Sequence, residues 1–249
     1  MSAIVTWLDR RWYAGVHAQW DDELLRERVL ACLSPDAIAL DLGAGSGRVA
    51  AMNFKAAEHS VFGIDVDRAI SANRQIDGGC VGDASRLPFR DAAFDLVFAD
   101  NVLEHLDKPE LVFAEVARVL KPGGRFLVKT PNGWHYVTVL ARLTPHRFHR
   151  WLNGCRGRHE TDTFPTRYLA NTRTTLGALA AIAGLEVASV VSVESRPEYA
   201  RIHPALYVFG RVYERIVNSA DWGAPFRIIL LGEFAKPQRP SVLRQHVPD

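Results

Sequence analysis

The chain has 249 residues, of which 48% are hydrophobic and 23% charged, and its formal net charge is +2. This composition is typical of a globular protein and excludes both a long disordered chain and a strongly charged one that would seek an oppositely charged polymer. No apolar run reaches the roughly 18 residues of a membrane span, and three scattered cysteines without a CxxC pair exclude a disulfide framework or a zinc ribbon, so we expect one large α/β domain in the reduced cytoplasm.

Residues 1–34 predict a helical cap. Asp9 follows the N-terminus too closely for the apolar core of a signal peptide. Several tryptophans in this stretch suit one or two helices folded over the mouth of a ligand site, and packing accounts for most of the aromatic residues. Tyr13 is the residue of this stretch that we expect to contact a substrate.

Residues 35–131 alternate short apolar runs with helical periodicity, which is the pattern of a parallel sheet with crossover helices. Buried strands are expected at 37–43, 60–66, 80–84, 94–100 and 124–131. Helices are expected at 48–57, 67–75 and 109–124, the last of which is stopped by a Pro-Gly-Gly sequence.

Residues 172–237 complete this sheet in the prediction. A helix at 172–184, a strand at 185–195, an amphipathic helix at 204–218 and a strand at 226–237 follow one another. The expected fold class is α/β: a doubly wound, seven-stranded, mostly parallel, Rossmann-like sheet with N-terminal helices and a cap insertion at 132–171. The proline-rich tail, residues 238–249, is expected to fray.

The stretch ALDLGAGSGRVA, residues 39–50, places Gly43, Gly45 and Gly47 directly behind the first strand. Three glycines within five residues cost backbone entropy on folding. A ligand that packs directly against the peptide backbone would explain why glycines are needed there. A strand, a glycine loop and a helix N-terminus form a nucleotide-binding corner, and ligands of such sheets lie beyond the carboxyl ends of the strands. The spacing is GxGxG rather than GxGxxG, and an ordinary tight turn is the alternative interpretation.

Carboxylates follow the next strands. Asp65 ends the second strand, where a carboxylate can accept hydrogen bonds from a ribose diol; its alternative role is to cap the following helix, for which Asp67 fits equally well. Asp83 ends the third strand and can accept from an exocyclic amine. Asp100 and Asn101 end the fourth strand at the same edge. The corner therefore suits an adenosyl ligand.

In LDLGAGSG, GIDVD, GDASRLPF, FDLVFADNVLEHL and LKPGG, the chain resembles the class I S-adenosylmethionine-dependent methyltransferases over residues 37–131. The resemblance implies S-adenosyl-L-methionine as cofactor, S-adenosyl-L-homocysteine as product and no metal. It implies that the glycine loop holds the methionine part, that Asp65 takes the ribose hydroxyls, and that Asp83 takes the adenine. The implied cofactor contacts are Asp41, Gly43, Ala44, Gly45, Gly47, Asp65, Val66, Asp83, Ala84, Asp100 and Asn101.

Two histidines are candidates for a catalytic role. A sulfonium methyl is strongly electrophilic, so the protein has mainly to position the acceptor in line with it. A hydroxyl acceptor must also lose its proton, which a histidine can take. His105 follows the fourth strand and His135 follows the fifth. The alternatives are helix capping together with Glu104 for His105 and an ordinary loop position for His135.

Residues 141–168 carry six arginines against two acidic residues, interleaved with aromatic residues. Arginine forks match phosphate and carboxylate oxygens, so we expect this segment to bind an anionic acceptor; a solvated basic loop is the alternative. The residues expected to bind the acceptor are Tyr13, Trp134, Arg147, Arg150 and Trp151. Three histidines of this segment lack a further ligating partner, and no metal site is expected.

The layout after the fifth strand resembles bacterial methyltransferases of glycan and secondary-metabolite pathways. This resemblance implies O-methylation of a small-molecule, sugar or glycolipid-like acceptor. The helix at 204–218 can serve as a lid, a dimer contact or a helix that rests on a membrane surface, and the pattern indicates no oligomeric state. Three other functions stay open: a nicotinamide-dependent oxidoreductase, a non-catalytic cofactor-binding module, and a nucleic-acid methyltransferase, against which the absence of an NPPY-like tetrapeptide counts.

Overall fold

The computed structural model describes residues 2–16, 20–56, 58–143 and 165–238. Its centre is a seven-stranded sheet with the strand order β3-β2-β1-β4-β5-β7-β6. The strands are β1 Ile38–Leu42, β2 Ser60–Asp65, β3 Gly78–Val81, β4 Phe94–Asp100, β5 Leu120–Pro131, β6 Glu186–Val193 and β7 Ile229–Ala235. The first five strands are parallel, and β7 runs antiparallel to both of its neighbours. The predicted fold class is confirmed.

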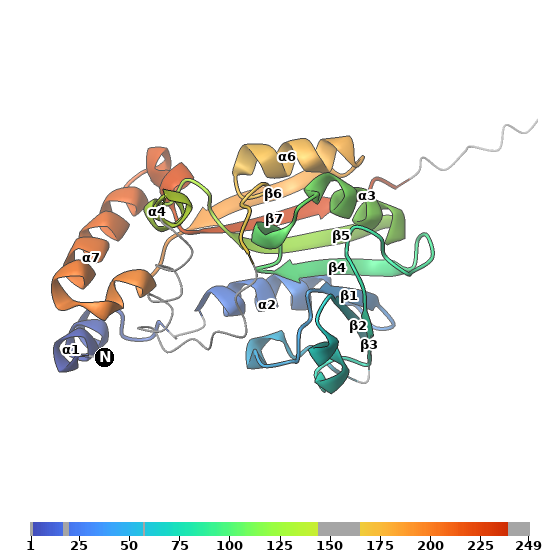
Figure 1. The fold of residues 1–249 in the computed structure, drawn as a ribbon, viewed down its shortest axis with the longest axis horizontal. Coiled ribbons are helices and arrows are strands. Elements are labelled where there is room, and N and C mark those ends of the chain that lie inside the picture. The colour runs from blue at the N-terminus through green and yellow to red at the C-terminus, as the bar shows by residue number, and fades with distance from the viewer. Residues whose placement is uncertain (1, 17–19, 57, 144–164, 239–249) are drawn as a thin grey trace, which may run out of the picture.

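Helices cover both faces of the sheet (Figure 1). Helices α3 (Pro109–Val119) and α6 (Arg173–Ile182) lie on one face, where Phe113 packs against Phe126 and Phe234 of the sheet. Helix α2 (Trp20–Cys32) lies on the other face and buries its apolar side in a cluster with strand residues. The two faces supply the hydrophobic core.

A third group of helices lies beyond one end of the sheet (Figure 1). It contains α1 (Ala3–Trp12) and α7 (Pro204–Asn218), with the 3₁₀ helices Glu198–Ile202 and Asp221–Phe226 packed against α7. Its small core is built around Tyr207, whose ring stacks on Trp12 and meets Tyr13 edge-on. We call this group the end unit. The remaining helix, α4 (Tyr136–Leu143), follows β5.

The helices expected at 48–57 and 67–75 are wrong. Short 3₁₀ helices, Ala50–Met52 and Arg68–Ala72, stand in their places. The guanidinium of Arg26 explains the first case, because its Nη1 donates to the carbonyls of Ala51 (2.7 Å) and Asn53 (2.6 Å), which a continuing α-helix would use internally. Tertiary contacts therefore override the local propensity.

Helix α3 ends at Val119 rather than at 124, since Leu120 has an extended backbone and opens β5. The Pro-Gly-Gly sequence lies inside the early part of that strand. The last strand begins at Ile229, after the 3₁₀ helix at 221–226, rather than at 226. Among the described residues, no helix combines the length and the hydropathy that crossing a bilayer requires.

The N-terminal helices differ from the expected cap. Helix α1 packs against α7 in the end unit, and α2 lies along the sheet. The first turn of α2 reaches the carboxyl ends of the strands through Asp21 and Asp22.

Candidate functional site

The glycine loop joins β1 to the 3₁₀ helix at 50–52, and all three of its glycines have positive φ angles: +74° at Gly43, +49° at Gly45 and +73° at Gly47. Other residues rarely adopt this conformation. A Cβ at Gly43 would collide with Val102, and one at Gly47 would collide with Asn73. Backbone conformation and neighbouring side chains thus both require glycine at these two positions.

Gly45 differs from the other two, because the nearest atom to an added Cβ is a carboxylate oxygen of Asp65, 4.0 Å away. Its N–H donates to Asp65 Oδ2 at 2.9 Å. The side-chain amide of Asn73 donates to the carbonyls of Ala44 (2.9 Å) and Gly45 (3.2 Å). Asp65 and Asn73 therefore hold the loop through its backbone, while Gly45 leaves its peptide uncovered by a side chain.

Asp65 sits at the carboxyl end of β2 and accepts from Gly45 and from the N–H of Asp67 (2.7 Å). The helix-capping role belongs to Asp67, which accepts from Ala69 at the start of the next helix. A carboxylate offers about four lone-pair sites. Asp65 therefore keeps the capacity to accept hydrogen bonds from a ligand.

Asp41 and Asp100 bring two more carboxylates to this edge. Burial raises the pKa of Asp41 well above its usual range, and the charges of Asp100 and Asp65 raise it further. Burial also raises the pKa of Asp100, to about 6, although Lys129 opposes that shift. Both carboxyl groups are poorly solvated, so their charge is costly unless a cation lies nearby.

Lys129 is the cation that β5 provides. Its side chain is fully buried, and its Nζ lies 2.8 Å from Asp100 and 3.0 Å from Asp21 and also contacts Asp22. Burial alone would lower the pKa of Lys129, but the three carboxylates raise it above its usual range. Among the ion pairs between described residues, Lys129 is shared by three carboxylates at this edge, Asp21, Asp22 and Asp100. Asp65 lies at the same edge and accepts from backbone N–H groups. The edge keeps an excess of negative charge.

The remaining predicted cofactor residues line the same edge. Asn101 has a φ of +52°, and its N–H donates to the carbonyl of Lys129 at 2.9 Å, which fixes the turn after β4. Asp83 is exposed and accepts from Ser85, and Ala84 is half-buried. Val66 follows β2 with 58% of its side chain exposed, which is unusual for an aliphatic residue beside a parallel sheet.

Glu104 is a buried carboxyl group that the sequence analysis treated only as a capping residue. Its Oε2 accepts from Thr130 Oγ1 at 3.0 Å, and Asn171 donates to the same Thr130 hydroxyl at 2.6 Å. Burial raises the pKa of Glu104 to about 7, against the opposing effect of its hydrogen bonds. The backbone carbonyl of Glu104 accepts from Arg167 and Tyr168, so this turn fastens the chain that re-enters the described structure at 165.

His105, the first catalytic candidate, lies in the 3₁₀ turn Leu103–His105 after β4 and is half-buried. Its Nδ1 lies 3.1 Å from the carbonyl oxygen of Pro165. A carbonyl oxygen can only accept, so Nδ1 carries the hydrogen, and Nε2 is the basic nitrogen of the neutral ring.

The expectation that His135 faces the substrate is wrong. The side chain is only 2% exposed, and the rings of Tyr136 and Tyr213 pack against it. Its Nδ1 accepts from Val137, and its Nε2 lies 3.4 Å from Glu194. The residue orients the turn that follows β5 and cannot meet an acceptor in this arrangement.

The predicted acceptor residues separate into three cases. Tyr13 is buried in the end unit, where its hydroxyl donates to Glu214 at 3.0 Å, so the structure does not bring it to the ligand edge. Trp134 is 62% exposed and lines a pocket beside the carboxyl end of β5, together with Thr172 and Arg173. Arg147, Arg150 and Trp151 lie outside the described residues.

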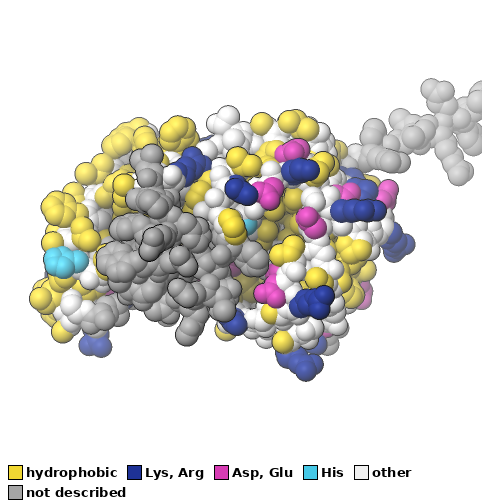
Figure 2. Space-filling view, viewed as in Figure 1, with side chains coloured by type: hydrophobic (Ala, Val, Ile, Leu, Met, Phe, Trp, Pro, Cys, Tyr) yellow, Lys and Arg dark blue, Asp and Glu magenta, His cyan; other side chains and the backbone are white. Residues whose placement is uncertain are grey.

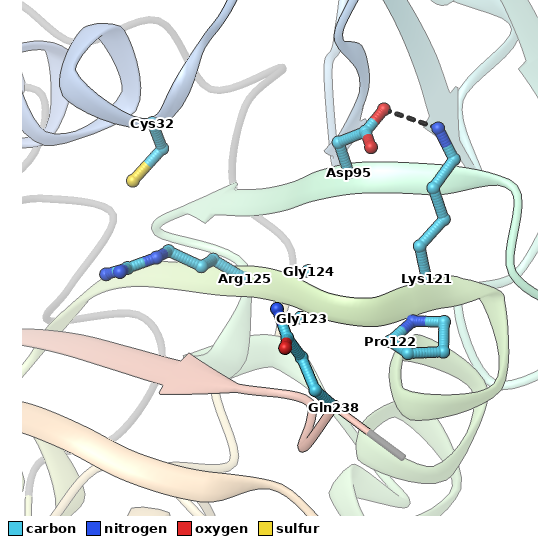
Figure 3. A pocket seen from close by; sticks show the side chains of 8 residues that line it. All are labelled: Cys32, Asp95, Lys121, Pro122, Gly123, Gly124, Arg125 and Gln238. Atoms are coloured by element: carbon cyan, nitrogen blue, oxygen red, sulfur yellow. Dashed lines mark hydrogen bonds and ion pairs between the residues drawn. The ribbon is translucent and has the colours of Figure 1, made fainter. Parts of the chain in front are cut away.

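A pocket at the opposite edge of the sheet carries no comparable chemistry (Figure 3). It lies at the amino ends of β4 and β5, and Lys121 there pairs with Asp95 at 2.7 Å. Because this pocket lies at the opposite edge of the sheet from the glycine loop, it is not the predicted site. In the described part of the chain, no group of three metal-ligating side chains comes together.

Sequence reasoning missed Lys129, Asp21, Asp22 and Asn73. A lysine within the apolar run FLVKTP is the one signal that pointed to a buried charge in β5. No local pattern connects Asn73 with the glycine loop, because their contact depends on the fold.

Known proteins with similar sequences include methyltransferases. The family described as a methyltransferase domain matches residues 40–128. The chain is 33% identical over 156 residues to 27-O-demethylrifamycin SV methyltransferase of Amycolatopsis mediterranei, a match that covers 51% of this chain and 57% of that protein. It is 32% identical over 128 residues to a ubiquinone/menaquinone biosynthesis C-methyltransferase of Rubrivivax gelatinosus. That match covers 48% of this chain and 49% of that protein. The chain thus spans about half the length of these curated relatives.

A solved structure with the same fold is geranyl diphosphate C-methyltransferase from Streptomyces coelicolor, in complex with Mg²⁺, geranyl diphosphate and S-adenosyl-L-homocysteine. It matches with a TM-score of 0.55 and 15% identity, covering 88% of this chain and 85% of that one. A likeness at this level of identity shows a shared fold.

Proposed function

Because the chain belongs to the class I S-adenosylmethionine-dependent methyltransferase superfamily, whose cofactor is S-adenosylmethionine, we propose that it methylates a small organic acceptor. The observation that carries this proposal is the uncompensated negative charge beside the glycine loop. Three carboxylates, those of Asp21, Asp22 and Asp100, share the ammonium group of Lys129, and the carboxylate of Asp65 lies at the same edge. A ligand with positive charge would be stabilised there.

The residues at this edge fit the cofactor. Its sulfonium and ammonium groups are cationic and match the acidic side chains around Asp100, whose ionised form a nearby cation favours. The bare peptide at Gly45 and the carboxylate of Asp65 would hold the amino-acid and ribose parts, with Asp83 at the adenine. The pyrophosphate of a nicotinamide dinucleotide is anionic and would be repelled by the same carboxylates, which counts against the oxidoreductase alternative.

Bound S-adenosylmethionine supplies an electrophilic methyl group on a positively charged sulfur. The protein's own contribution is to exclude water and to hold the acceptor's lone pair in line, about 3 Å from the reacting carbon. With a hydroxyl acceptor, an oxygen–methyl bond forms as the sulfur–methyl bond breaks, and the hydroxyl proton leaves. We assign that proton to Nε2 of His105, because the bond from Nδ1 to Pro165 sets the tautomer.

The finer proposal is O-methylation of a small-molecule, sugar or glycolipid-like acceptor. Its support is the relative whose name gives an O-demethylated compound as the one methylated, together with the tautomer that Pro165 sets at His105. Relatives named as C-methyltransferases favour a second candidate, methylation of an activated carbon. A carbon acceptor also loses a proton, so either reaction can use the same base.

Calorimetric titration with S-adenosylhomocysteine and with NAD⁺ tests the general proposal. We expect micromolar binding of the first and no binding of the second. Incubation with cofactor labelled with ¹³C at the methyl group, followed by NMR of the product, then separates methoxy from C-methyl carbons. If NAD⁺ binds and S-adenosylhomocysteine does not, the proposal is wrong.

A further inference from the structure

Helix α7 presents its apolar side to solvent. Its buried positions are Tyr207, Gly210, Glu214 and Val217, a face that combines two hydrophobic core residues with a glycine and a carboxylate. The side chains of Phe209, Val212 and Ile216 are 72%, 51% and 49% exposed. These three residues follow the spacing of one helix face, and that face lies opposite the buried one.

Specific contacts fix this orientation. The hydroxyl of Tyr207 donates to Asp9, and Glu214 accepts from Tyr13. At Gly210 an added Cβ would lie 2.5 Å from Pro197, so the helix approaches its neighbour closely there. Turning α7 to bury its apolar side would break all three contacts. The outward apolar face is therefore a built feature of the end unit.

Neighbouring elements extend the exposed apolar surface. On α1, Ile4 and Trp7 share one helix side and are 59% and 64% exposed. Trp222, in the 3₁₀ helix packed against α7, is 60% exposed. Figure 2 shows hydrophobic side chains along the end of the molecule where Figure 1 places α1 and α7. This surface is a projecting end of the molecule rather than a groove.

The charges of the end unit separate in a definite way. Its acidic residues Asp9, Glu198 and Glu214 point inward and are held by arginines of the same unit. Arg10 and Arg11 at the end of α1 are exposed, and the side chain of Arg215 on α7 is 67% exposed. Asp221 is the exposed acid beside them. The outer surface is thus apolar and flanked mainly by positive charge.

We propose that the α1–α7 end of the molecule docks on an anionic lipid bilayer. A helix with aliphatic and aromatic residues on its outer side and arginines at its flank inserts into the headgroup boundary, where acidic lipids attract the arginines. A symmetric dimer through the same face would set two positively flanked surfaces against each other, with Asp221 as the exposed acid that the described end unit offers, and like charges oppose that contact. The binding does not depend on methyl transfer.

Vesicle flotation of the full chain tests the proposal, with vesicles of phosphatidylcholine alone and of phosphatidylcholine mixed with phosphatidylglycerol. We expect binding to the anionic vesicles, a blue shift of tryptophan fluorescence as Trp7 and Trp222 leave water, and weaker binding as salt rises. The double variant F209S/I216S should lower the partition coefficient at least about ten-fold, from loss of buried apolar area.

The variant Ile182→Ser is the matched control, because Ile182 is 77% exposed on α6, on a face of the sheet outside the end unit. It should bind vesicles like the parent chain. Absence of binding to anionic vesicles overturns the proposal, and so does equal binding by F209S/I216S. If sedimentation shows a dimer that F209S/I216S dissociates, the face joins two copies of the chain and the proposal is wrong.

Discussion

Two regions of this molecule bury charged groups, and they balance them differently. At the carboxyl edge of the sheet, Asp41, Asp65 and Asp100 converge, while Lys129 is the cation that meets the cluster among described ion pairs. In the end unit, the inward-facing acids are paired with arginines; Asp9, for example, lies 3.2 Å from Arg196 and 2.7 Å from Arg201.

The difference separates a ligand site from a scaffold. The end unit pairs its own charged side chains and needs no ligand to neutralise them. What it exposes to solvent is apolar surface. An edge that keeps excess charge at some cost in stability has that charge available for a ligand. Three variants test this contrast.

The largest effect is expected for Lys129→Met. This variant removes the ammonium from three carboxylates, and a buried uncompensated charge costs about 3–5 kcal/mol of unfolding free energy. Chemical denaturation should show that loss at pH 8. The loss should shrink near pH 5, because protonation of Asp100, whose pKa is already about 6, removes the repulsion.

Lys121→Met is the control for that variant, on the same strand. Lys121 pairs with one half-exposed carboxylate, Asp95, so its removal should cost less than about 1 kcal/mol. Equal losses of unfolding free energy in the two variants would mean that the charge cluster at the carboxyl edge of the sheet stabilises the protein no more than a surface ion pair does.

An intermediate effect is expected for Asp65→Ala. We expect affinity for S-adenosylhomocysteine to fall by about 1–3 kcal/mol, roughly 5- to 150-fold in Kd, from loss of a charged hydrogen-bond acceptor. Calorimetric titration measures it. Asp67→Ala, which removes a helix cap two residues away, should leave the Kd unchanged. An unaltered Kd for Asp65→Ala would place the ribose contacts elsewhere.

The smallest effect is expected for Tyr13→Phe in the end unit. Loss of the hydrogen bond to Glu214 should cost about 1 kcal/mol of unfolding free energy. Glu214 keeps its contacts with Asn218 and Arg211, which limits the loss. Methyl transfer should be unaffected in steady-state assays. A fall in activity at unchanged stability would return Tyr13 to the acceptor site, where the sequence analysis expected it.

The sheet could be predicted from the sequence because its strands are short apolar runs ended by turn residues. The glycine loop and the acids that follow β2 and β4 could be predicted because parallel strands bring their carboxyl ends to one edge. Contacts remote in sequence could not be predicted. Arg26 prevents a helix at 48–57 through two carbonyls, and Lys129 meets acids more than a hundred residues earlier in the chain.

The orientation of α7 shows a further limit. Periodicity correctly predicts an amphipathic helix at 204–218, and the usual inference is that the apolar side faces the core. Gly210 and the hydrogen-bonded side chains of Tyr207 and Glu214 instead select their own face of the helix for burial. His135 shows the opposite case, a polar residue enclosed by tyrosines that a loop position gave no reason to expect.

The chain that leaves β5 and the chain that returns to α6 are fastened to each other. The guanidinium of Arg142 donates to the carbonyl of Tyr168 at 2.8 Å and lies 5.3 Å from the centre of its ring, while Glu104 holds the backbone of the same residue. Both ends of the intervening sequence are thus anchored by contacts outside it, and lengthening such a closed insert costs little free energy. The sequence between 144 and 164 can therefore be exchanged or lengthened while the contacts that fasten Arg142 and Glu104 to Tyr168 stay in place.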